Sequence, residues 1–407
     1  MAEEVLIPGL RFPEFEGVWE KDQLRNLVTF KSGGTPSVEN EDYWGGDIPW
    51  ISAASMEGKY YKKSERTLTE AGLKAGSRIS QEGSMLLLVR GSMLYNKVPI
   101  GLVNKPVAFN QDLKSLIPSS KICREFLYEW FMFSQHRLLG LVVGTGIGAG
   151  KLDMDDLSRL EIPLPSIPEQ QKIASFLTSV DKRIQLLQEK KAQLERYKKG
   201  VMQKLFSQEI RFKDENGNDF PEWEEKRLGE LTVKTGRKNK ENLQLPVYSI
   251  NNQVGFLPQG DQFDGMDSTA RGFDTSMYKI VTKNTFAYNP ARINVGSYGY
   301  SGDLDNIIIS SLYVCFQTLD ALDDRYLLQY LGTYNFNKSV LRNVEGGVRD
   351  YLFYENFSNI KIPLPSLAEQ QKISTFLEKI DELIGKIKEQ VEVSQNFKNG
   401  LLQKMFV

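Results

Sequence analysis

Two stretches of the chain carry the same long pattern of apolar residues, spaced by steps of four and three. The apolar positions are Ile173, Leu177, Val180, Ile184, Leu187, Leu194, Val201 and Leu205 in the first stretch, and Ile373, Leu377, Ile380, Ile384, Ile387, Val391, Leu401 and Met405 in the second. This spacing places apolar side chains on one stripe of a helix and is typical of a coiled-coil seam. A helix over residues 169–206 would be roughly 57 Å long at 1.5 Å per residue.

The two stretches are copies of each other. Ile-Pro-Leu-Pro-Ser begins at Ile162 and again at Ile362, and Glu-Gln-Gln-Lys-Ile follows both times. The offset of 200 residues holds without a gap to Lys204 and Lys404. A repeat of this kind fixes the architecture, and two such helices in one chain most simply pack on each other.

Each copy begins with a helix start signal. Ser166 can cap the first helix, and Glu169, three residues later, completes a capping box; Ser366 and Glu369 repeat the pattern. Four polar residues interrupt the apolar seam and predict imperfect packing there, namely Lys191, Lys198, Ser394 and Lys398.

The duplication extends to whole half-chains. Trp19 is followed by leucines five and eight residues later, and Trp223 is followed by leucines at the same two spacings. An aromatic-Pro-Glu segment precedes both tryptophans. The polar segment 213–219 contains an Asn-Gly turn signal and is typical of a linker.

Between these anchors the pattern changes to short apolar strands separated by turn residues. The first half predicts strands at 48–52, 84–89 and 98–103 and a helix at 121–139; the second half predicts strands at 245–249, 285–288 and 307–309 and a helix at 325–341. The fold class expected is therefore α+β, with two mixed, mostly β domains that are each followed by a long helix. The expected boundaries are 1–161 for the first domain, 162–207 for the first helix, 208–222 for the linker, 223–361 for the second domain and 362–407 for the second helix.

The composition is that of an ordinary globular protein, with 41% hydrophobic and 25% charged residues in 407. No apolar run approaches the ~18 residues of a membrane span, and the first residues do not form a signal peptide, so an intracellular protein is expected. Cys123 and Cys315 fall one in each half, which makes a disulfide or a metal cluster improbable. His136 is the single histidine, which disfavours zinc sites and histidine acid–base chemistry.

The formal net charge of −1 argues against a generally basic nucleic-acid coat. The charge is nevertheless uneven, because residues 162–206 carry nine Lys/Arg and four Asp/Glu, whereas residues 362–406 carry six of each. A solvated helix face explains such a bias more often than a binding site does.

The motifs resemble those of a known family, the specificity subunit of type I restriction–modification systems. The resemblance rests on the two Ile-Pro-Leu-Pro-Ser-x-x-Glu-Gln-Gln-Lys-Ile helices, on the aromatic-Pro-Glu entries, and on Gly34-Thr35-Pro36 followed by Trp44-Gly45 and Ile48-Pro49-Trp50. It covers nearly the whole chain. The resemblance implies two target-recognition domains that each read one half of a split, asymmetric DNA site, on an antiparallel spacer made by the two helices.

The same resemblance implies the partners. Double-stranded DNA, two methyltransferase subunits and two restriction subunits are expected to bind, and the chain itself is expected to be non-catalytic, without a metal or cofactor. S-adenosylmethionine, ATP and Mg are expected on the partner subunits only, and the complex is expected in the cytoplasm on DNA. Two readers on a rigid spacer should contact the duplex about one helical turn apart, ~34 Å. The gap between half-sites would then depend on the length of the spacer helices.

Base readout needs side chains that can form paired hydrogen bonds, chiefly Arg to guanine and Asn or Gln to adenine. Polar residues at strand ends and loops are therefore the DNA-binding candidates: Thr35, Ser52, Ser55, Arg90, Ser92, Asn96, Lys97, Gln111 and Lys151 in the first half, and Arg237, Lys238, Asn239, Lys240, Asn251, Asn252, Arg271, Asn289, Arg292, Asn294 and Arg349 in the second. Lys238 and Lys240 fit phosphate contacts better. Arg90 and Arg292 follow corresponding apolar strands and are the strongest individual candidates.

Two other classes of function stay open at this point. One is a self-contained methyltransferase or nuclease, but residues 144–150 lack a βαβ context, residues 289–292 lack the aromatic of an amino-methyltransferase motif, and the Asp47, Glu57 and Lys59 combination has no counterpart in the second half. The other is a coiled-coil adaptor whose domains bind protein. Sequence-specific DNA binding with a steep salt dependence would separate the adaptor from the favoured interpretation.

Overall fold

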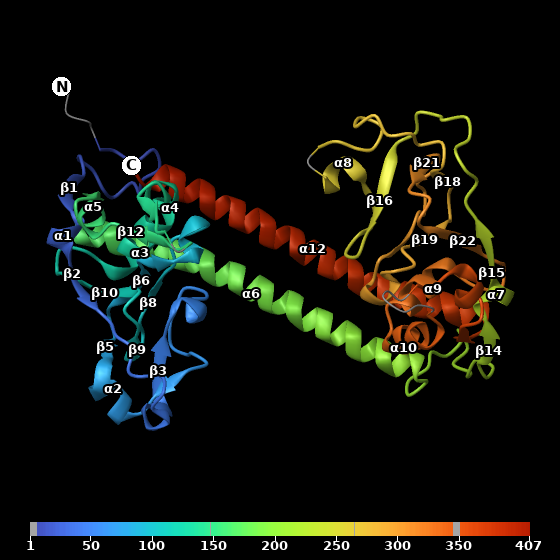
Figure 1. The fold of residues 1–407 in the computed structure, drawn as a ribbon, viewed down its shortest axis with the longest axis horizontal. Coiled ribbons are helices and arrows are strands. Elements are labelled where there is room, and N and C mark those ends of the chain that lie inside the picture. Colours follow the sequence, from blue (N-terminus) through green and yellow to red (C-terminus); the bar gives the residue numbers. More distant parts are fainter. Residues whose placement is uncertain (1–5, 147, 264, 345–350) are drawn as a thin grey trace. The chain divides into compact units, whose positions relative to one another are not determined.

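The chain forms two compact units in the computed structural model, which describes residues 6–146, 148–263, 265–344 and 351–407. Unit 1 comprises Met1–Gln188 and Glu389–Val407, and unit 2 comprises Glu189–Lys388. Two long helices, α6 (Ile167–Phe206) and α12 (Leu367–Met405), are each divided between the units. Each unit therefore contains one globule, the first part of the helix that follows it and the last part of the other long helix (Figure 1).

Unit 1 is built around a four-stranded sheet whose order is β2-β10-β6-β8. Its strands are β2 (Val28–Ser32), β10 (Leu113–Pro118), β6 (Met85–Leu88) and β8 (Ile100–Leu102). A second sheet, β4-β3-β9-β5, contains β4 (Thr67–Leu68), β3 (Trp44–Ile51), β9 (Val107–Phe109) and β5 (Arg78–Ser80). Every residue of β6 is buried, so this continuous apolar run forms a central strand of the core.

The smaller elements of unit 1 surround these sheets. They are β1 (Glu20–Gln23) paired with β13 (Glu161–Leu164), the sheet of β11 (Val142–Gly144), β12 (Gly150–Leu152) and β7 (Arg90–Gly91), the helices α1 (Leu24–Leu27), α2 (Glu70–Gly76), α3 (Arg124–Phe133), α4 (Gln135–Leu139) and α5 (Met154–Ser158), and the short helices η1 (Glu41–Tyr43), η2 (Ala53–Ser55) and η3 (Ser92–Tyr95). Within unit 1 the second sheet and α2 lie away from α6, at the far end of the globule (Figure 1).

Unit 2 repeats this topology. The sheet β15-β22-β19-β20 consists of β15 (Thr232–Thr235), β22 (Val314–Thr318), β19 (Phe286–Tyr288) and β20 (Tyr298–Tyr300), and the sheet β17-β16-β21-β18 consists of β17 (Gly255–Pro258), β16 (Val247–Asn251), β21 (Ile307–Ile309) and β18 (Lys279–Val281). The second sheet of each unit contains one parallel pair, β3 with β9 and β16 with β21. Unit 2 also contains β14 (Glu224–Arg227) paired with β23 (Lys361–Leu364), α7 (Leu228–Leu231), α8 (Gln259–Gln262), α9 (Asp324–Leu331), α10 (Tyr334–Asn343), α11 (Tyr354–Phe357) and η4 (Ile293–Val295). The two mixed domains, each followed by a long helix, confirm the predicted α+β class.

The single helices predicted at 121–139 and 325–341 are each two helices. In unit 1 the chain turns at Ser134 between α3 and α4. In unit 2 it turns at Gly332 and Thr333, and the Thr333 hydroxyl accepts a hydrogen bond from the Phe336 N–H at 3.1 Å. A hydroxyl residue that caps a new helix competes with continuation of the old one, and the apolar pattern does not reveal this.

Inside each unit the parts of the two long helices run antiparallel. In unit 1, Asp181 of α6 accepts Lys398 of α12 at 2.5 Å, and the neighbours Leu10 and Arg11 bond to Lys404 and Glu169. In unit 2, Asp381 of α12 accepts Lys198 of α6 at 2.6 Å, and the neighbours Ile210 and Arg211 bond to Lys204 and Glu369. Lys198 and Lys398 are two of the four predicted interruptions of the apolar seam. Each of these two lysines forms an ion pair with the other long helix.

The expected capping boxes are wrong for the glutamate side chains, although the Ser366 hydroxyl does accept the Glu369 N–H at 3.4 Å. Glu169 is buried, and its carboxylate accepts hydrogen bonds from Arg11 Nε at 2.7 Å and from Trp19 Nε1 at 3.3 Å. Glu369 does the same with Arg211 and Trp223. The glutamates attach each helix start to the segment that enters its own globule, which is a long-range role that local spacing does not predict.

The glutamine that follows each of these glutamates is equally buried. Gln170 donates to the carbonyls of Lys121 and Pro165 and accepts the N–H of Cys123 at 2.7 Å. Gln370 makes the same three contacts one repeat later, with Ala321, Pro365 and Asp323. Both amides are satisfied by backbone groups, so each helix start has a fixed orientation on its globule.

Unit 1 contains a buried group of four charges. The Lys59 ammonium lies 2.8 Å from both Glu129 and Asp181, and the Lys398 ammonium lies 3.0 Å from Glu129 and 2.5 Å from Asp181. Burial alone would lower the pKa of Lys59, but the charges of Glu129 and Asp181 outweigh it and raise that pKa. Two cations and two anions thus join the globule to both long helices.

Candidate nucleic-acid interface

Arg90 and Lys151 are 61 residues apart in the chain but face each other across neighbouring strands. Lys151 of β12 pairs with Arg90 of β7, both side chains are exposed, and among the described residues no ion pair neutralises either one. Like charges directly opposite each other on a sheet are destabilising. The pair therefore favours binding of an anion, such as a phosphate, at this position.

Three further candidates continue from this strand pair. Ser92 begins η3, and the N–H groups of Asn96 and Lys97 both donate to the Met93 carbonyl at 3.0 Å. All three side chains are exposed. The structure thus brings five of the candidates of unit 1 together on one turn and its neighbouring strand.

A second group lies where Thr35 meets Gln111. The Thr35 hydroxyl donates to Gln111 Oε1 at 2.5 Å, and the preceding N–H of Gly34 donates to the Phe109 carbonyl at 2.9 Å. A Cβ at Gly33 would lie 2.3 Å from the Phe109 carbonyl, so this close approach of two backbones requires glycine. Ser52 and Ser55 lie at the start and end of η2 and are half-buried.

In unit 2 two loops that carry candidate residues lie next to each other. The turn after β16 carries Asn252, whose carbonyl lies 3.5 Å from the Cβ position of Gly296 in the loop that carries Arg292 and Asn294. The three side chains are exposed. Asn251 and Asn289 each use Oδ1 to accept a backbone N–H two residues later, which leaves the amide N–H₂ of each as the group that can donate.

Arg90 and Arg292 lie at similar places that differ by one residue, because Arg90 directly follows Val89 whereas Arg292 is the second residue after Pro290. The carbonyl of Val89, next to Arg90, accepts the N–H of Leu152, and the carbonyl of Pro290, near Arg292, accepts the N–H of Leu352. Arg292 is the N-cap of η4, whereas Arg90 precedes Gly91, which is the N-cap of η3. Whether either one contacts a base stays a prediction.

The other candidates of unit 2 lie on different loops. Arg237, Lys238 and Lys240 are exposed beside the bridge between Lys238 and Lys279. Arg271 stacks on Phe263 and donates to the carbonyl of the same residue at 2.9 Å, so part of its guanidinium already holds its loop. Arg349 lies outside the described residues.

Asn239 does not have the exposed position that was expected. Its side chain is 1% exposed, and it both donates to the Leu243 carbonyl and accepts the Leu243 N–H at 2.9 Å. The amide closes the loop 239–243 and is not presented at the surface. It is therefore removed from the candidates.

Sequence reasoning missed two features. One is the buried group of four charges in unit 1, where Lys59 had been considered only as part of a nuclease core. The other is Arg66, an exposed residue that stacks on Trp44 and Trp50. Neither feature has a spacing signal, because each joins residues from different strands or helices.

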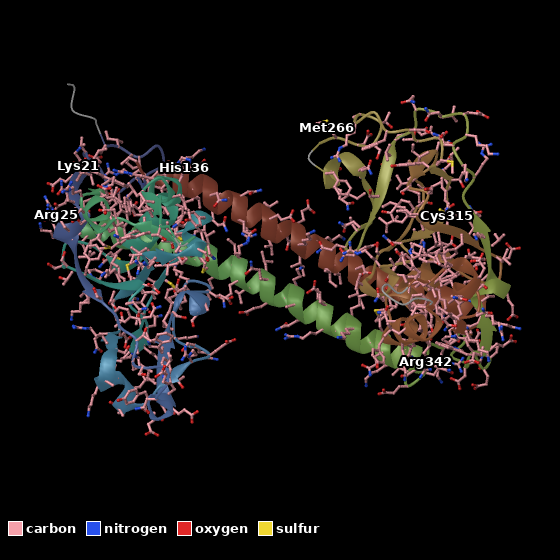
Figure 2. All side chains as sticks on the ribbon, viewed as in Figure 1. Lys21, Arg25, His136, Met266, Cys315 and Arg342 are labelled. Carbon is pink, nitrogen blue, oxygen red and sulfur yellow. The ribbon has the colours of Figure 1, made fainter. Side chains whose placement is uncertain are left out.

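The described residues contain neither a cluster of metal ligands nor a membrane-spanning helix. Within residues 6–146, 148–263, 265–344 and 351–407, no three His, Cys, Asp or Glu side chains are grouped as metal ligands would be. In the same ranges no helix is long and apolar enough to cross a membrane. His136 is exposed on α4 of unit 1 (Figure 2).

Comparison with known proteins gives consistent matches over both halves. Residues 16–196 and 221–393 match the family model of the type I restriction modification DNA specificity domain. The chain is 26% identical over 411 residues to the type I restriction enzyme MjaIX specificity subunit of Methanocaldococcus jannaschii, covering 95% of this chain and 92% of that protein. It is 32% identical over 174 residues to the EcoR124I/EcoR124II specificity subunit of Escherichia coli, covering 42% of this chain and 43% of that one.

Two solved structures share the fold. The S subunit of a type I restriction–modification system from M. genitalium matches with a TM-score of 0.61 and 18% identity, covering 99% of both chains. A chain from a structural study of assembly and conformational transition in a type I system matches with a TM-score of 0.55 and 16% identity, covering 95% of this chain and 97% of that one.

Proposed function

Because the chain belongs to the family of type I restriction–modification DNA specificity subunits, we propose that its two units read the two halves of a split DNA site. A specificity subunit is the DNA-recognition component of such a system and not its catalyst. We assign target recognition to residues 1–161 and 223–361, and the spacer to helices 162–207 and 362–407.

The observation that carries this proposal is that both units share a frame, the contacts that hold each helix start on its globule, whereas their exposed polar loops differ. The glutamate and glutamine contacts at the two helix starts are the same in both units. The exposed loops differ, with Arg90 opposite Lys151 in unit 1 and, in unit 2, Asn252 near Gly296 of the loop that carries Arg292. Two readers with separate targets need a common frame and separate contact residues.

The partners follow from the family. The chain would direct adenine methylation by two methyltransferase subunits and, in the full complex, cleavage by two restriction subunits. S-adenosylmethionine, ATP and Mg would bind those partners, and the complex would act in the cytoplasm. The gap between half-sites would depend on the spacer, since α6 has 40 residues and α12 has 39, about 60 Å of helix each.

The test is to co-express this chain with the methyltransferase subunit of its own system and to map N6-methyladenine across a genome. The proposal predicts two short defined blocks separated by a gap of fixed length and unspecified sequence. A single continuous block would mean that only one unit reads DNA. A stable complex without methylation would favour the adaptor function instead.

A further inference from the structure

The guanidinium of Arg66 lies over the ring of Trp44 and beside that of Trp50, on the second sheet of unit 1. Its guanidinium carbon lies 3.9 Å from the ring centroid of Trp44 and 5.4 Å from that of Trp50, and the two indoles are 5.2 Å apart at 88°. Within the described part of the chain, no hydrogen bond or ion pair involves the guanidinium. Stacking fixes the plane of the arginine and leaves its N–H edges free.

The same two indoles hold the loop that carries Thr35. Trp44 Nε1 donates to the Ser37 carbonyl at 3.1 Å, and Trp50 Nε1 donates to the Gly34 carbonyl at 3.3 Å. Thr35 lies between these anchors and donates to Gln111. We name Trp44 and Trp50 the tryptophan platform, because they fix both Arg66 and the Thr35 loop.

The loop before Arg66 adds two exposed cations, although Glu65 precedes Arg66 directly and Asp47 lies on β3 between the two tryptophans. Lys62 and Lys63, in the loop before Arg66, are exposed, and among the residues that the structure describes no ion pair is formed by either one. On the α2 side of the Thr35 loop, a groove of about 620 Å³ is lined by Lys31 and Arg78, among others. Lysine and arginine side chains of this kind are the groups that bind phosphates.

We propose that Arg66 reads a guanine in the half-site of unit 1, donating from its free edge to O6 and N7. This inference rests on the proposed function and adds a specific contact to it. A guanidinium whose plane is fixed before binding loses little entropy when it forms two parallel hydrogen bonds. An arginine that only completed the sheet would need no free edge.

The experiment uses the full chain in complex with its methyltransferase partner and duplexes in which each base pair of the mapped site is exchanged in turn. In Arg66→Ala we expect the preference for one G·C pair, in the block read by unit 1, to fall by roughly 5- to 150-fold, the range for one paired arginine–guanine contact. Arg66→Lys should lose part of the same preference. The other positions should keep theirs.

Arg25→Ala is the matched control, an exposed arginine on α1 of the same unit (Figure 2). It should change no position. An equal loss at every position with Arg66→Ala, or a lowered melting temperature without a change in preference, would overturn the inference, since either result describes a phosphate contact or a structural role. If the unsubstituted complex showed no preference for any base pair in the block read by unit 1, the proposed function would be overturned as well. That result would be known before any variant is made.

Discussion

The two units attach the long helices to their globules with different charges. In unit 2, Lys198 pairs with Asp381, and the amide of Gln329 donates to the same carboxylate at 3.0 Å. In unit 1, the equivalent of Gln329 is Glu129, which is fully buried and would repel Asp181 if it were alone. Lys59 provides the compensating positive charge.

The position of Lys59 in the chain explains why only unit 1 has this additional positive charge. It lies in the loop between η2 and β4, in the part of unit 1 that has little sequence in common with unit 2. The shared frame consists of helix residues at an offset of 200, and the globule contributes only where one of its loops reaches the frame. A change from glutamine to glutamate at this position therefore requires a cation from that loop.

A second contrast is steric. Phe133 of unit 1 stacks on Phe406 at a centroid distance of 5.5 Å, whereas the corresponding residue of unit 2 is Thr333. A cavity of about 670 Å³ remains beside Phe206 in unit 2, lined by Thr333, Met202 and Ile384 among others. The frame tolerates this loss because Phe206 still packs on Tyr326 and Tyr330.

The largest loss of stability should follow from removing the buried glutamate that both units share at the start of the long helix. Glu169→Ala should destabilise unit 1 and Glu369→Ala should destabilise unit 2, each by about 3–5 kcal/mol, because each removes a buried carboxylate that an arginine and an indole N–H share. The arginine then keeps its backbone carbonyl acceptors. Amide hydrogen exchange under native conditions reports the two units separately.

The exposed neighbours Gln171 and Gln371 provide matched controls. Their alanine variants should change stability by no more than about 0.5 kcal/mol. A large loss from Glu169→Ala with little effect from Glu369→Ala would show that the two starts are not equivalent.

A smaller loss of stability, confined to unit 1, should follow from removing Lys59. Lys59→Met should destabilise unit 1 by about 2–3 kcal/mol, less than a fully unpaired buried charge would cost, because Lys398 remains beside Glu129. The double variant Lys59→Met, Glu129→Gln reproduces the neutral arrangement of unit 2 and should recover most of that loss. Urea unfolding followed by hydrogen exchange measures both.

Lys62→Met is the matched control, because Lys62 lies in the same loop as Lys59 but is exposed. It should have almost no effect. If the double variant were less stable than Lys59→Met alone, the compensation between Lys59 and Glu129 would be wrong.

The smallest effect on stability is expected from acid. Burial would raise the pKa of Asp181, but Lys398 and Lys59 outweigh it and hold that pKa below its ordinary value of 3.8. A carboxyl whose folded pKa is lowered contributes stability above pH 3.8, and this contribution is lost as pH falls through the folded pKa. Unit 1 should therefore weaken below about pH 4, and Asp181→Asn should weaken less steeply over the same range. An equally steep acid loss in Asp181→Asn would assign that loss to other groups.

Much of the fold could be predicted from the sequence, because the repeat and the apolar seam are periodic. The same periodic reasoning assigned Glu169 to a local cap and Lys198 to a defect in the seam. Both residues bind partners far away in the chain, and spacing alone carries no information about such contacts. The helix break at Thr333 was missed for a different reason, since its hydroxyl competes with an otherwise uninterrupted apolar pattern.

The candidate interface could be predicted only in outline. Loop position correctly placed Arg90, Arg292 and most other candidates at the surface, but it also included Asn239, which the fold uses to close its own loop. Arg66 was missed, although Trp44 and Trp50 had been noted. Its importance depends on stacking between β3 and the loop before β4, which appears only when the chain is folded.

The most direct measurement compares Arg66→Ala and Arg292→Ala on one panel of duplexes, with methylation rates measured for every exchange in both blocks of the mapped site. Arg25→Ala and Arg342→Ala are the exposed controls, one in each unit (Figure 2). If the two units read separate half-sites, Arg66→Ala should relax one base pair in one block and Arg292→Ala one base pair in the other, each by about 1–3 kcal/mol. Relaxation of the same block by both variants would contradict the account.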